Sequence, residues 1–167
     1  PMKEIVDKIL ICDTGSTDRT KEIIREFTAE VYDFPWKNDF SAARNFISEK
    51  VSTDYWMWLD ADDMITQENL YRLKQLKDFD EWNHAAFSCY RERILKTSRN
   101  FRWRGRVHES IIPTGNILYS PIQIEHRKIK PCSSFRNLHI YQQMIEEGEP
   151  LEPRDLFYYG RELFYHK

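Results

Sequence analysis

The chain has 167 residues, of which 41% are hydrophobic and 31% are charged. This composition excludes an intrinsically disordered tail, and no stretch approaches the about 18 consecutive apolar residues that a membrane span requires. The 25 lysines and arginines are balanced by 27 aspartates and glutamates, which gives a formal net charge of −2. We therefore expect a folded core with no membrane span. We also expect no nucleic-acid partner, because nucleic acids are usually bound by a strongly basic surface.

Cysteine and glycine usage narrows the possibilities further. The 3 cysteines include no C-x-x-C pair, and an odd, dispersed set favours a reducing compartment such as the cytoplasm. Only 5 glycines are present, whereas average usage would give about twelve. Neither a P-loop nor a G-x-G-x-x-G motif occurs. A phosphate-binding site in this chain therefore needs ligands other than a glycine-rich loop.

Strands and helices alternate in the first part of the chain. Apolar runs and helical spacing predict strands over 8–12, 31–34 and 55–59, with helices over 18–27 and 39–47 between them. This alternation predicts an α/β fold with a Rossmann-like, mainly parallel sheet flanked by helices. Ligands bind such a sheet beyond the carboxyl ends of its strands. Because Asp13 and Asp60 each follow a predicted strand, we expect both at the same edge.

The second part of the chain shows a different pattern of predicted secondary structure. A polar helix is predicted over 66–77, and short apolar runs separated by glycine and proline then predict β structure. Helical spacing returns at Ser133, and Pro153 marks the start of a last helix. We therefore assign 1–132 to an α/β domain and 133–167 to a helical extension.

Three carboxylates follow the hydrophobic strand predicted over 55–59. Asp60, Asp62 and Asp63 occupy four positions, and like charges this close are unfavourable unless a cation compensates them. Mg²⁺ or Mn²⁺ prefers oxygen ligands from one or two carboxylates together with substrate phosphates. The motif therefore indicates a site for a metal-bound diphosphate. The alternative is that these acids cap the following helix and remain solvated.

Other acidic motifs fit the same residues poorly. A phosphatase of the haloacid-dehalogenase type would have threonine where this chain has Met64. A calcium-binding loop of the EF-hand type would need glycine and glutamate where Ile65 and Tyr71 stand.

Three motifs together resemble those of family 2 glycosyltransferases of the GT-A fold. They are C-D-T-G-S-T-D-R-T at 12–20, F-S-A-A-R-N at 40–45 and W-L-D-A-D-D at 58–63. The segment 103–109 is similar to one in a bacterial subgroup whose transferase domain precedes tetratricopeptide-like helices, which would explain the helical extension. The resemblance implies a GT-A nucleotide-sugar-binding fold over roughly 5–130. It also implies that the first strand of the family is missing, so we expect a chain cut at both ends.

The resemblance assigns the nucleotide site to three residues. Asp13 would accept a hydrogen bond from the nucleotide base, commonly a uracil imide. Arg44 would contact the base or the diphosphate, because a guanidinium and a helix start both favour anions. Asp60 would meet the ribose or a water bound to the metal.

The resemblance also implies a metal site. Asp62 would ligate the Mn²⁺ or Mg²⁺ that bridges the two phosphates, and Asp63 would be structural. His126 would be a late metal or diphosphate ligand, with an ordinary half-buried histidine as the alternative.

The base that accepts the proton of the incoming hydroxyl is expected late in the domain. The matching position holds His108 and Glu109. We expect Glu109 to be the base and His108 to align the acceptor or a phosphate. The alternative is that Glu109 forms a surface ion pair with Arg104 or Arg106.

These roles describe a metal-dependent, inverting glycosyltransferase. It would use a nucleotide-sugar donor, with UDP favoured, and a polysaccharide, lipid-linked or peptide acceptor. A protein partner could bind through the C-terminal helices. One alternative is a non-catalytic nucleotide- or carbohydrate-binding module with a GT-A shell, and a less favoured one is a metal-dependent phosphatase.

Overall fold

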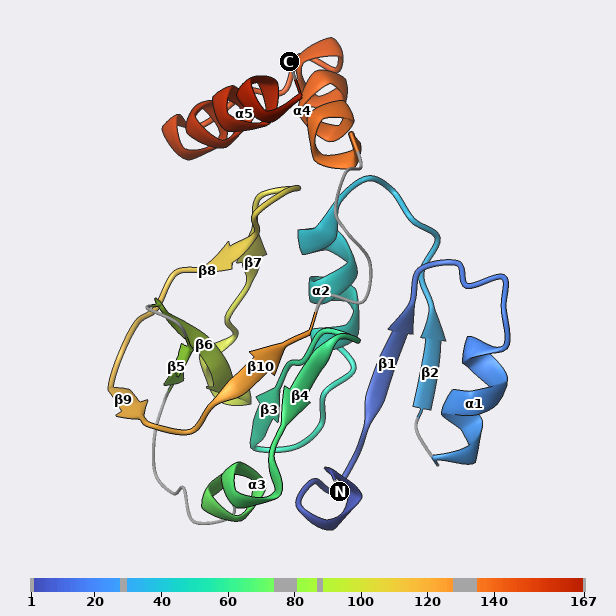
Figure 1. Ribbon diagram of the computed structural model, residues 1–167, viewed down its shortest axis with the longest axis vertical. Helices are drawn as coiled ribbons and strands as arrows, with labels where there is room; N and C mark the ends of the chain where they lie inside the picture. Colours follow the sequence, from blue (N-terminus) through green and yellow to red (C-terminus); the bar gives the residue numbers. More distant parts are fainter. Residues whose placement is uncertain (1, 28–29, 74–80, 87–88, 128–134, 167) are drawn as a thin grey trace.

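A computed structural model of the chain describes residues 2–27, 30–73, 81–86, 89–127 and 135–166 (Figure 1). The α-helices are α1 (Thr20–Glu26), α2 (Phe40–Ser48), α3 (Gln67–Leu73), α4 (Arg136–Glu146) and α5 (Pro153–Tyr165), and short 3₁₀ helices span Met2–Glu4 and Thr97–Arg99. The strands are β1 (Leu10–Asp13), β2 (Glu30–Asp33), β3 (Tyr55–Met57), β4 (Asp63–Ile65), β5 (Glu81–Ala86), β6 (Cys89–Lys96), β7 (Trp103–Arg104), β8 (Ser110–Ile111), β9 (Ile117–Ser120) and β10 (Ile124–His126).

Most predicted elements form close to their expected positions. The helix predicted over 39–47 is α2, which begins after Asp39, whose carboxylate accepts a hydrogen bond from the Ala42 amide at 2.9 Å. Pro153 occupies the first turn of α5, behind a capping box formed by Glu152 and Asp155. The helix predicted over 66–77 is seen as α3, and its last predicted residues lie outside the described part of the chain.

The predicted mainly parallel sheet is not confirmed. The described strands form six pairings, of which β1 with β2 and β5 with β9 are parallel and the others are antiparallel. Strand β3 pairs with β6, so β1 and β3 belong to different sheets. The expectation that Asp13 and Asp60 share one sheet edge is therefore not confirmed. Local apolar runs locate strands, but partners far along the chain decide the pairing.

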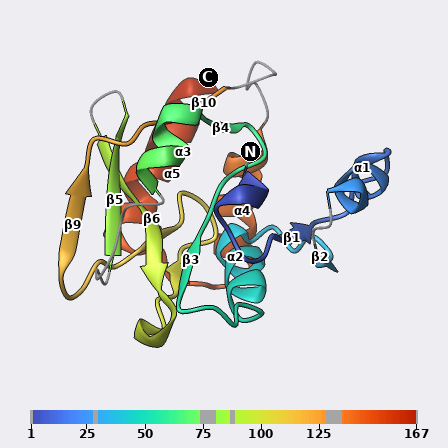
Figure 2. The ribbon, with the colours of Figure 1, turned by 90° about the horizontal axis from the view of Figure 1, so that it is seen from below.

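The elements are arranged around three apolar clusters. Strands β1 and β2 lie with α1 at one side of the molecule (Figures 1 and 2), and α4 and α5 lie at the end that is nearest α2 and β7 in Figure 1. The clusters are centred on Trp58, Leu95 and Trp103, on Ile122 and Ile124, and on Val107, Ile140, Tyr141 and Met144. Since the third cluster joins α4 to the segment before Ser110, the terminal helices pack directly on the rest of the chain.

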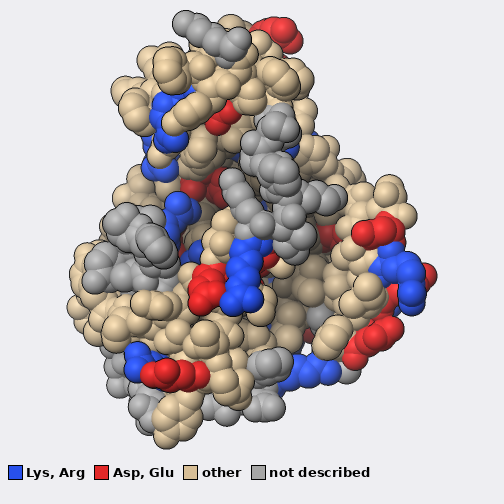
Figure 3. Space-filling model, viewed as in Figure 1, with Lys and Arg blue, Asp and Glu red and all other residues tan. Residues whose placement is uncertain are grey.

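The predicted boundary between 132 and 133 lies outside the described residues. Among the helices that the structure describes, none has the length and apolar character needed to cross a membrane. On the face shown in Figure 3, acidic and basic side chains are interspersed.

Candidate active site

An acidic cluster forms where the loop after β3 meets β10. Asp60, Asp62, Asp63 and His126 each offer a ligand atom, and these atoms lie within 4.8 Å of one another. Antiparallel pairing of β4 with β10 places Asp63 opposite His126, and the Arg127 amide donates to the Asp62 carbonyl at 2.8 Å. The pairing of β4 with β10 therefore places His126 next to three carboxylates that precede it by more than sixty positions in the sequence.

Asp63 is the buried member of this cluster. Its side chain has no exposed surface, and its carboxylate accepts hydrogen bonds from Arg93 at 2.6 Å and from the Asp60 amide at 2.9 Å. Burial alone would raise the pKa of Asp63, but the Asp60 amide and the Arg93 charge outweigh it and hold that pKa below its usual range. This arrangement fits the structural role expected for Asp63, whereas Asp60, Asp62 and His126 remain partly exposed.

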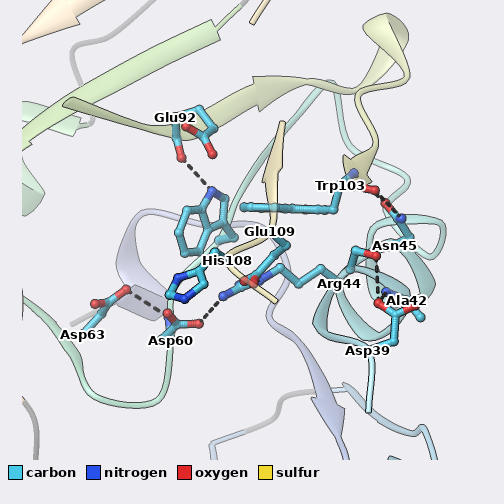
Figure 4. Close-up of polar contacts among 12 residues, drawn as sticks. Asp39, Ala42, Arg44, Asn45, Asp60, Asp63, Glu92, Trp103, His108 and Glu109 are labelled. Atoms are coloured by element: carbon cyan, nitrogen blue, oxygen red, sulfur yellow. Dashed lines mark hydrogen bonds and ion pairs between the residues drawn. The ribbon is translucent and has the colours of Figure 1, made fainter. Parts of the chain in front are cut away.

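Arg44 links the acidic cluster to Glu109. Its guanidinium donates to Asp60 Oδ1 at 2.8 Å and to Glu109 Oε1 at 2.6 Å (Figure 4). The indole rings of Trp58 and Trp103 lie 4.6 Å and 4.8 Å from the guanidinium carbon. Burial would lower the pKa of Arg44, yet the two carboxylates raise it above its ordinary value. Arg44 is thus a fixed cation between two carboxylates.

A second layer of contacts holds the indoles that flank Arg44. The Asn45 side-chain amide donates to the Trp103 carbonyl at 3.0 Å and accepts from the Trp103 amide at 2.9 Å. Trp58 donates from its indole nitrogen to the Glu92 carbonyl at 2.7 Å, and Arg93 covers the face of its ring. Sequence reasoning missed Asn45 and Arg93 as supporting residues. The position of Asn45 next to Arg44 in the F-S-A-A-R-N motif was the available signal.

Glu109 and His108 face different neighbours. The Glu109 side chain is only 11% exposed, and its observed ion pair is with Arg44. Among the described residues, the alternative ion pair with Arg104 or Arg106 is not formed, and Arg106 instead contacts two glutamates that follow α4, Glu147 and Glu149. The His108 imidazole stacks on Tyr158 of α5 with ring centroids 4.0 Å apart. Burial holds the pKa of His108 below its ordinary value, despite the opposing effect of Glu162.

Asp13 forms a separate polar centre at the ends of β1 and β2. Its buried carboxylate accepts hydrogen bonds from the amides of Gly15 at 3.3 Å and Ser16 at 3.1 Å. Lys21 lies 3.3 Å from Asp13 and 2.6 Å from Asp33, which is the partner of Asp13 in the strand register. Hydrogen bonds from Ser16, with Lys21, hold the pKa of Asp13 below its ordinary value against the effect of burial. The lysine therefore compensates two like charges at adjacent strand ends.

Comparison with known proteins identifies the family. The model of "Glycosyl transferase family 2" matches residues 3–142. The chain belongs to this family. Membership in glycosyl transferase family 2 implies an α/β fold of the GT-A type, and divalent metals are commonly used in the family, for which the acidic cluster supplies suitable ligands.

Individual relatives of this family 2 chain are similar over different lengths. The SPbeta prophage-derived glycosyltransferase SunS of Bacillus subtilis is 27% identical over 97% of this chain and 44% of its own length. An uncharacterized glycosyltransferase of Mycoplasma pneumoniae is 24% identical over 78% of this chain and 49% of its own length. A TPR repeat-containing protein of Synechococcus elongatus is 36% identical over 54% of this chain and 22% of its own length. The chain thus spans less than half the length of these curated relatives.

Proposed function

We propose that this chain contains the donor site and the base of a metal-dependent, inverting glycosyltransferase that uses a UDP-linked sugar. The observation that carries the proposal is the continuous polar unit in which Arg44 joins the acidic cluster to Glu109. Sugar transfer requires a cation at the leaving diphosphate and a base at the incoming hydroxyl. The two ends of this unit offer those two chemistries.

The donor set of the cluster fits a Mn²⁺ or Mg²⁺ ion. Asp63 is buried and bonded to Arg93, and His126 Nδ1 lies 3.2 Å from both Asp62 Oδ1 and Asp63 Oδ1. The partly exposed groups Asp62, His126 and the second oxygen of Asp60 would therefore be the ligands. Two carboxylates are hard oxygen ligands, and an imidazole nitrogen favours Mn²⁺ over Mg²⁺. When bound, the ion would neutralise the charge that develops on the nucleoside diphosphate as it leaves.

Glu109 would accept the proton of the acceptor. Among the contacts between described residues, its Oε1 is bonded to Arg44, so Oε2 would be the basic atom. As the acceptor oxygen bonds to the anomeric carbon, its proton passes to Glu109, and the bond from that carbon to the diphosphate breaks. Attack from the side opposite the leaving group inverts the anomeric centre.

Other nucleotide contacts extend the proposal. Arg44 would reach the diphosphate with the N–H groups not used by Asp60 and Glu109. Asp13 would read the nucleotide base by exchanging one of its loop hydrogen bonds for the base imide. Asp60 would also meet the ribose.

The remaining proposals concern the setting of the enzyme. Cysteine usage supports a cytoplasmic location, and the acceptor would be a polysaccharide, a lipid-linked molecule or a peptide. The exposed side chains of Leu156, Phe157 and Phe164 support a protein contact through α5.

Metal and nucleotide binding test this function directly. We expect Mn²⁺ with UDP to raise the melting temperature of the protein, and Asp62→Asn to abolish that rise because it removes a ligand charge. Glu68→Gln is the matched control, since this exposed carboxylate belongs to α3 and pairs with Arg72 outside the cluster. A wild-type protein whose melting temperature does not respond to Mn²⁺ and UDP would contradict the proposed metal-diphosphate site.

Turnover separates the enzyme from a binding module. We expect metal-dependent hydrolysis or transfer from at least one nucleotide sugar in a donor screen, and we expect Glu109→Gln to abolish transfer while UDP binding persists. Binding without turnover, together with a neutral effect of Glu109→Gln, would instead indicate a non-catalytic module.

A further inference from the structure

The segment that carries Glu109 has an unusual backbone. Gly105 has a φ of +91°, and His108 has a φ of +53°. The left-handed conformation of His108 is one that residues other than glycine rarely adopt. A short segment of this kind does not hold its shape by local preference. Contacts from elsewhere in the fold must therefore set the direction in which Glu109 points.

Helix α5 supplies these contacts on both sides of Glu109. Arg154 donates to the His108 carbonyl at 2.9 Å and to the Ser110 hydroxyl at 2.9 Å, so a single guanidinium bridges the two neighbours of Glu109. Tyr158, one turn further along α5, stacks on the His108 imidazole with ring centroids 4.0 Å apart and an interplanar angle of 17°.

The same segment is anchored at its base. Val107 is buried in a cluster with Ile140, Tyr141 and Met144 of α4, and Tyr158 packs against this cluster. The helix pair thus holds the segment by an apolar anchor, a ring stack and two hydrogen bonds. Arg44 of α2 holds the Glu109 carboxylate from the other end at 2.6 Å.

We propose that α5 positions the catalytic carboxylate, with Arg154 and Tyr158 acting as positioning residues that fix the backbone on either side of Glu109. This inference rests on the proposed role of Glu109 as the base. His108 accordingly serves as the stacking surface for α5, in place of the substrate contact expected from the sequence. Helices α4 and α5 then contribute to the transferase site by holding Glu109 in position.

The test compares steady-state transfer by the wild-type protein and its variants with a nucleotide sugar that the donor screen shows to be used. We expect Arg154→Met to lower kcat by roughly 10- to 100-fold, because small displacements of a reacting group are costly. The donor KM and the thermal response to Mn²⁺ with UDP should stay unchanged, since Asp60, Asp62 and His126 lie on other elements. Arg154→Lys should recover part of the loss.

Matched variants separate positioning from general stability. Arg72→Met removes an exposed arginine of α3 that pairs with Glu68, and its kcat should equal that of the wild type. Tyr158→Phe keeps the ring stack and should keep kcat, whereas Tyr158→Ala should lower it. If Arg154→Met unfolds at the assay temperature, the pair of Tyr158 variants carries the test.

Two outcomes would overturn the inference. One is a wild-type kcat in Arg154→Met and Tyr158→Ala, and the other is a donor KM that rises while kcat is unchanged. Failure of the proposed function has a different signature, because the wild-type protein itself would then show no transfer.

Discussion

Replacing Arg44 with methionine removes the cation that joins Asp60 to Glu109. Methionine keeps much of the side-chain length and its contacts with the indoles of Trp58 and Trp103, so the change acts mainly on charge. Two hydrogen bonds between ionised groups are lost, at 2.8 Å and 2.6 Å. The variant therefore isolates the electrostatic part of this junction.

The size of the effect follows from the burial of the two carboxylates. The Asp60 side chain is 40% exposed and regains water when Arg44 is lost. The Glu109 side chain is 11% exposed and loses the ion-pair partner that it has among the described residues, so it becomes a nearly buried, uncompensated charge. Removing one partner of a fully buried pair costs about 3–5 kcal/mol, and a charged hydrogen bond contributes about 1.5–3 kcal/mol. We therefore expect Arg44→Met to lower the free energy of unfolding by about 2–4 kcal/mol.

Urea unfolding followed by tryptophan fluorescence measures this loss, with Arg44→Lys as the control that keeps the charge and loses the planar fork. The double variant Arg44→Met/Glu109→Gln then tests the cause. Glu109→Gln leaves no buried charge behind, so we expect a coupling energy of about 1–3 kcal/mol between the two sites. Strictly additive effects of the two substitutions would refute the reasoning, because the loss would then not arise from their ion pair.

Three further substitutions test other parts of the structure. Burial lowers the pKa of His108 in the folded state, so the unfolded chain binds a proton at a higher pH than the folded chain does. Stability is therefore lost as pH falls below the ordinary histidine pKa of about 6.5. His108→Phe keeps a ring against Tyr158 and removes this titration, so the unfolding free energy of the variant should fall less steeply between about pH 7 and 5. The buried Tyr141 hydroxyl has no hydrogen-bond partner among the described residues, so Tyr141→Phe should raise the unfolding free energy by about 1 kcal/mol, and a loss would show that the hydroxyl is bonded. Asn45→Ala removes the side chain that is bonded to both the Trp103 amide and the Trp103 carbonyl, and it should lower the free energy of unfolding in urea by about 1–3 kcal/mol. An unchanged urea midpoint would contradict this prediction.

Local patterns were sufficient to predict most of the helices and strands. The helix predicted over 39–47 is seen as Phe40–Ser48, and the helix predicted from Pro153 is α5. These predictions succeed because capping residues and helical spacing act within a few positions of one another. The pairing of the strands was not predictable in the same way, and β3 lies beside β6 in an antiparallel arrangement.

The candidate site likewise has features that local sequence predicts and features that depend on contacts between distant segments. The acidic residues Asp60, Asp62 and Asp63 are neighbours in the sequence, so their clustering could be predicted, and His126 was proposed as a companion that the β4–β10 pairing then brings to them. The sequence contained no local signal that Arg44 meets Glu109, which is 65 positions away. It also contained no signal that Arg154 of α5 bridges the neighbours of Glu109.

The sequence by itself therefore determined the family, most of the secondary structure and which charged and ligand-bearing side chains the candidate site contains. Motifs and helix signals involve residues that are close in the sequence, and the charge and ligand atoms of a side chain do not depend on where the fold places it. Only the tertiary structure decided which charges are paired and which are accessible, because those outcomes depend on burial and on contacts between distant segments. Arg44 and His108 show this most clearly, since both are motif residues whose partners come from other elements of the fold.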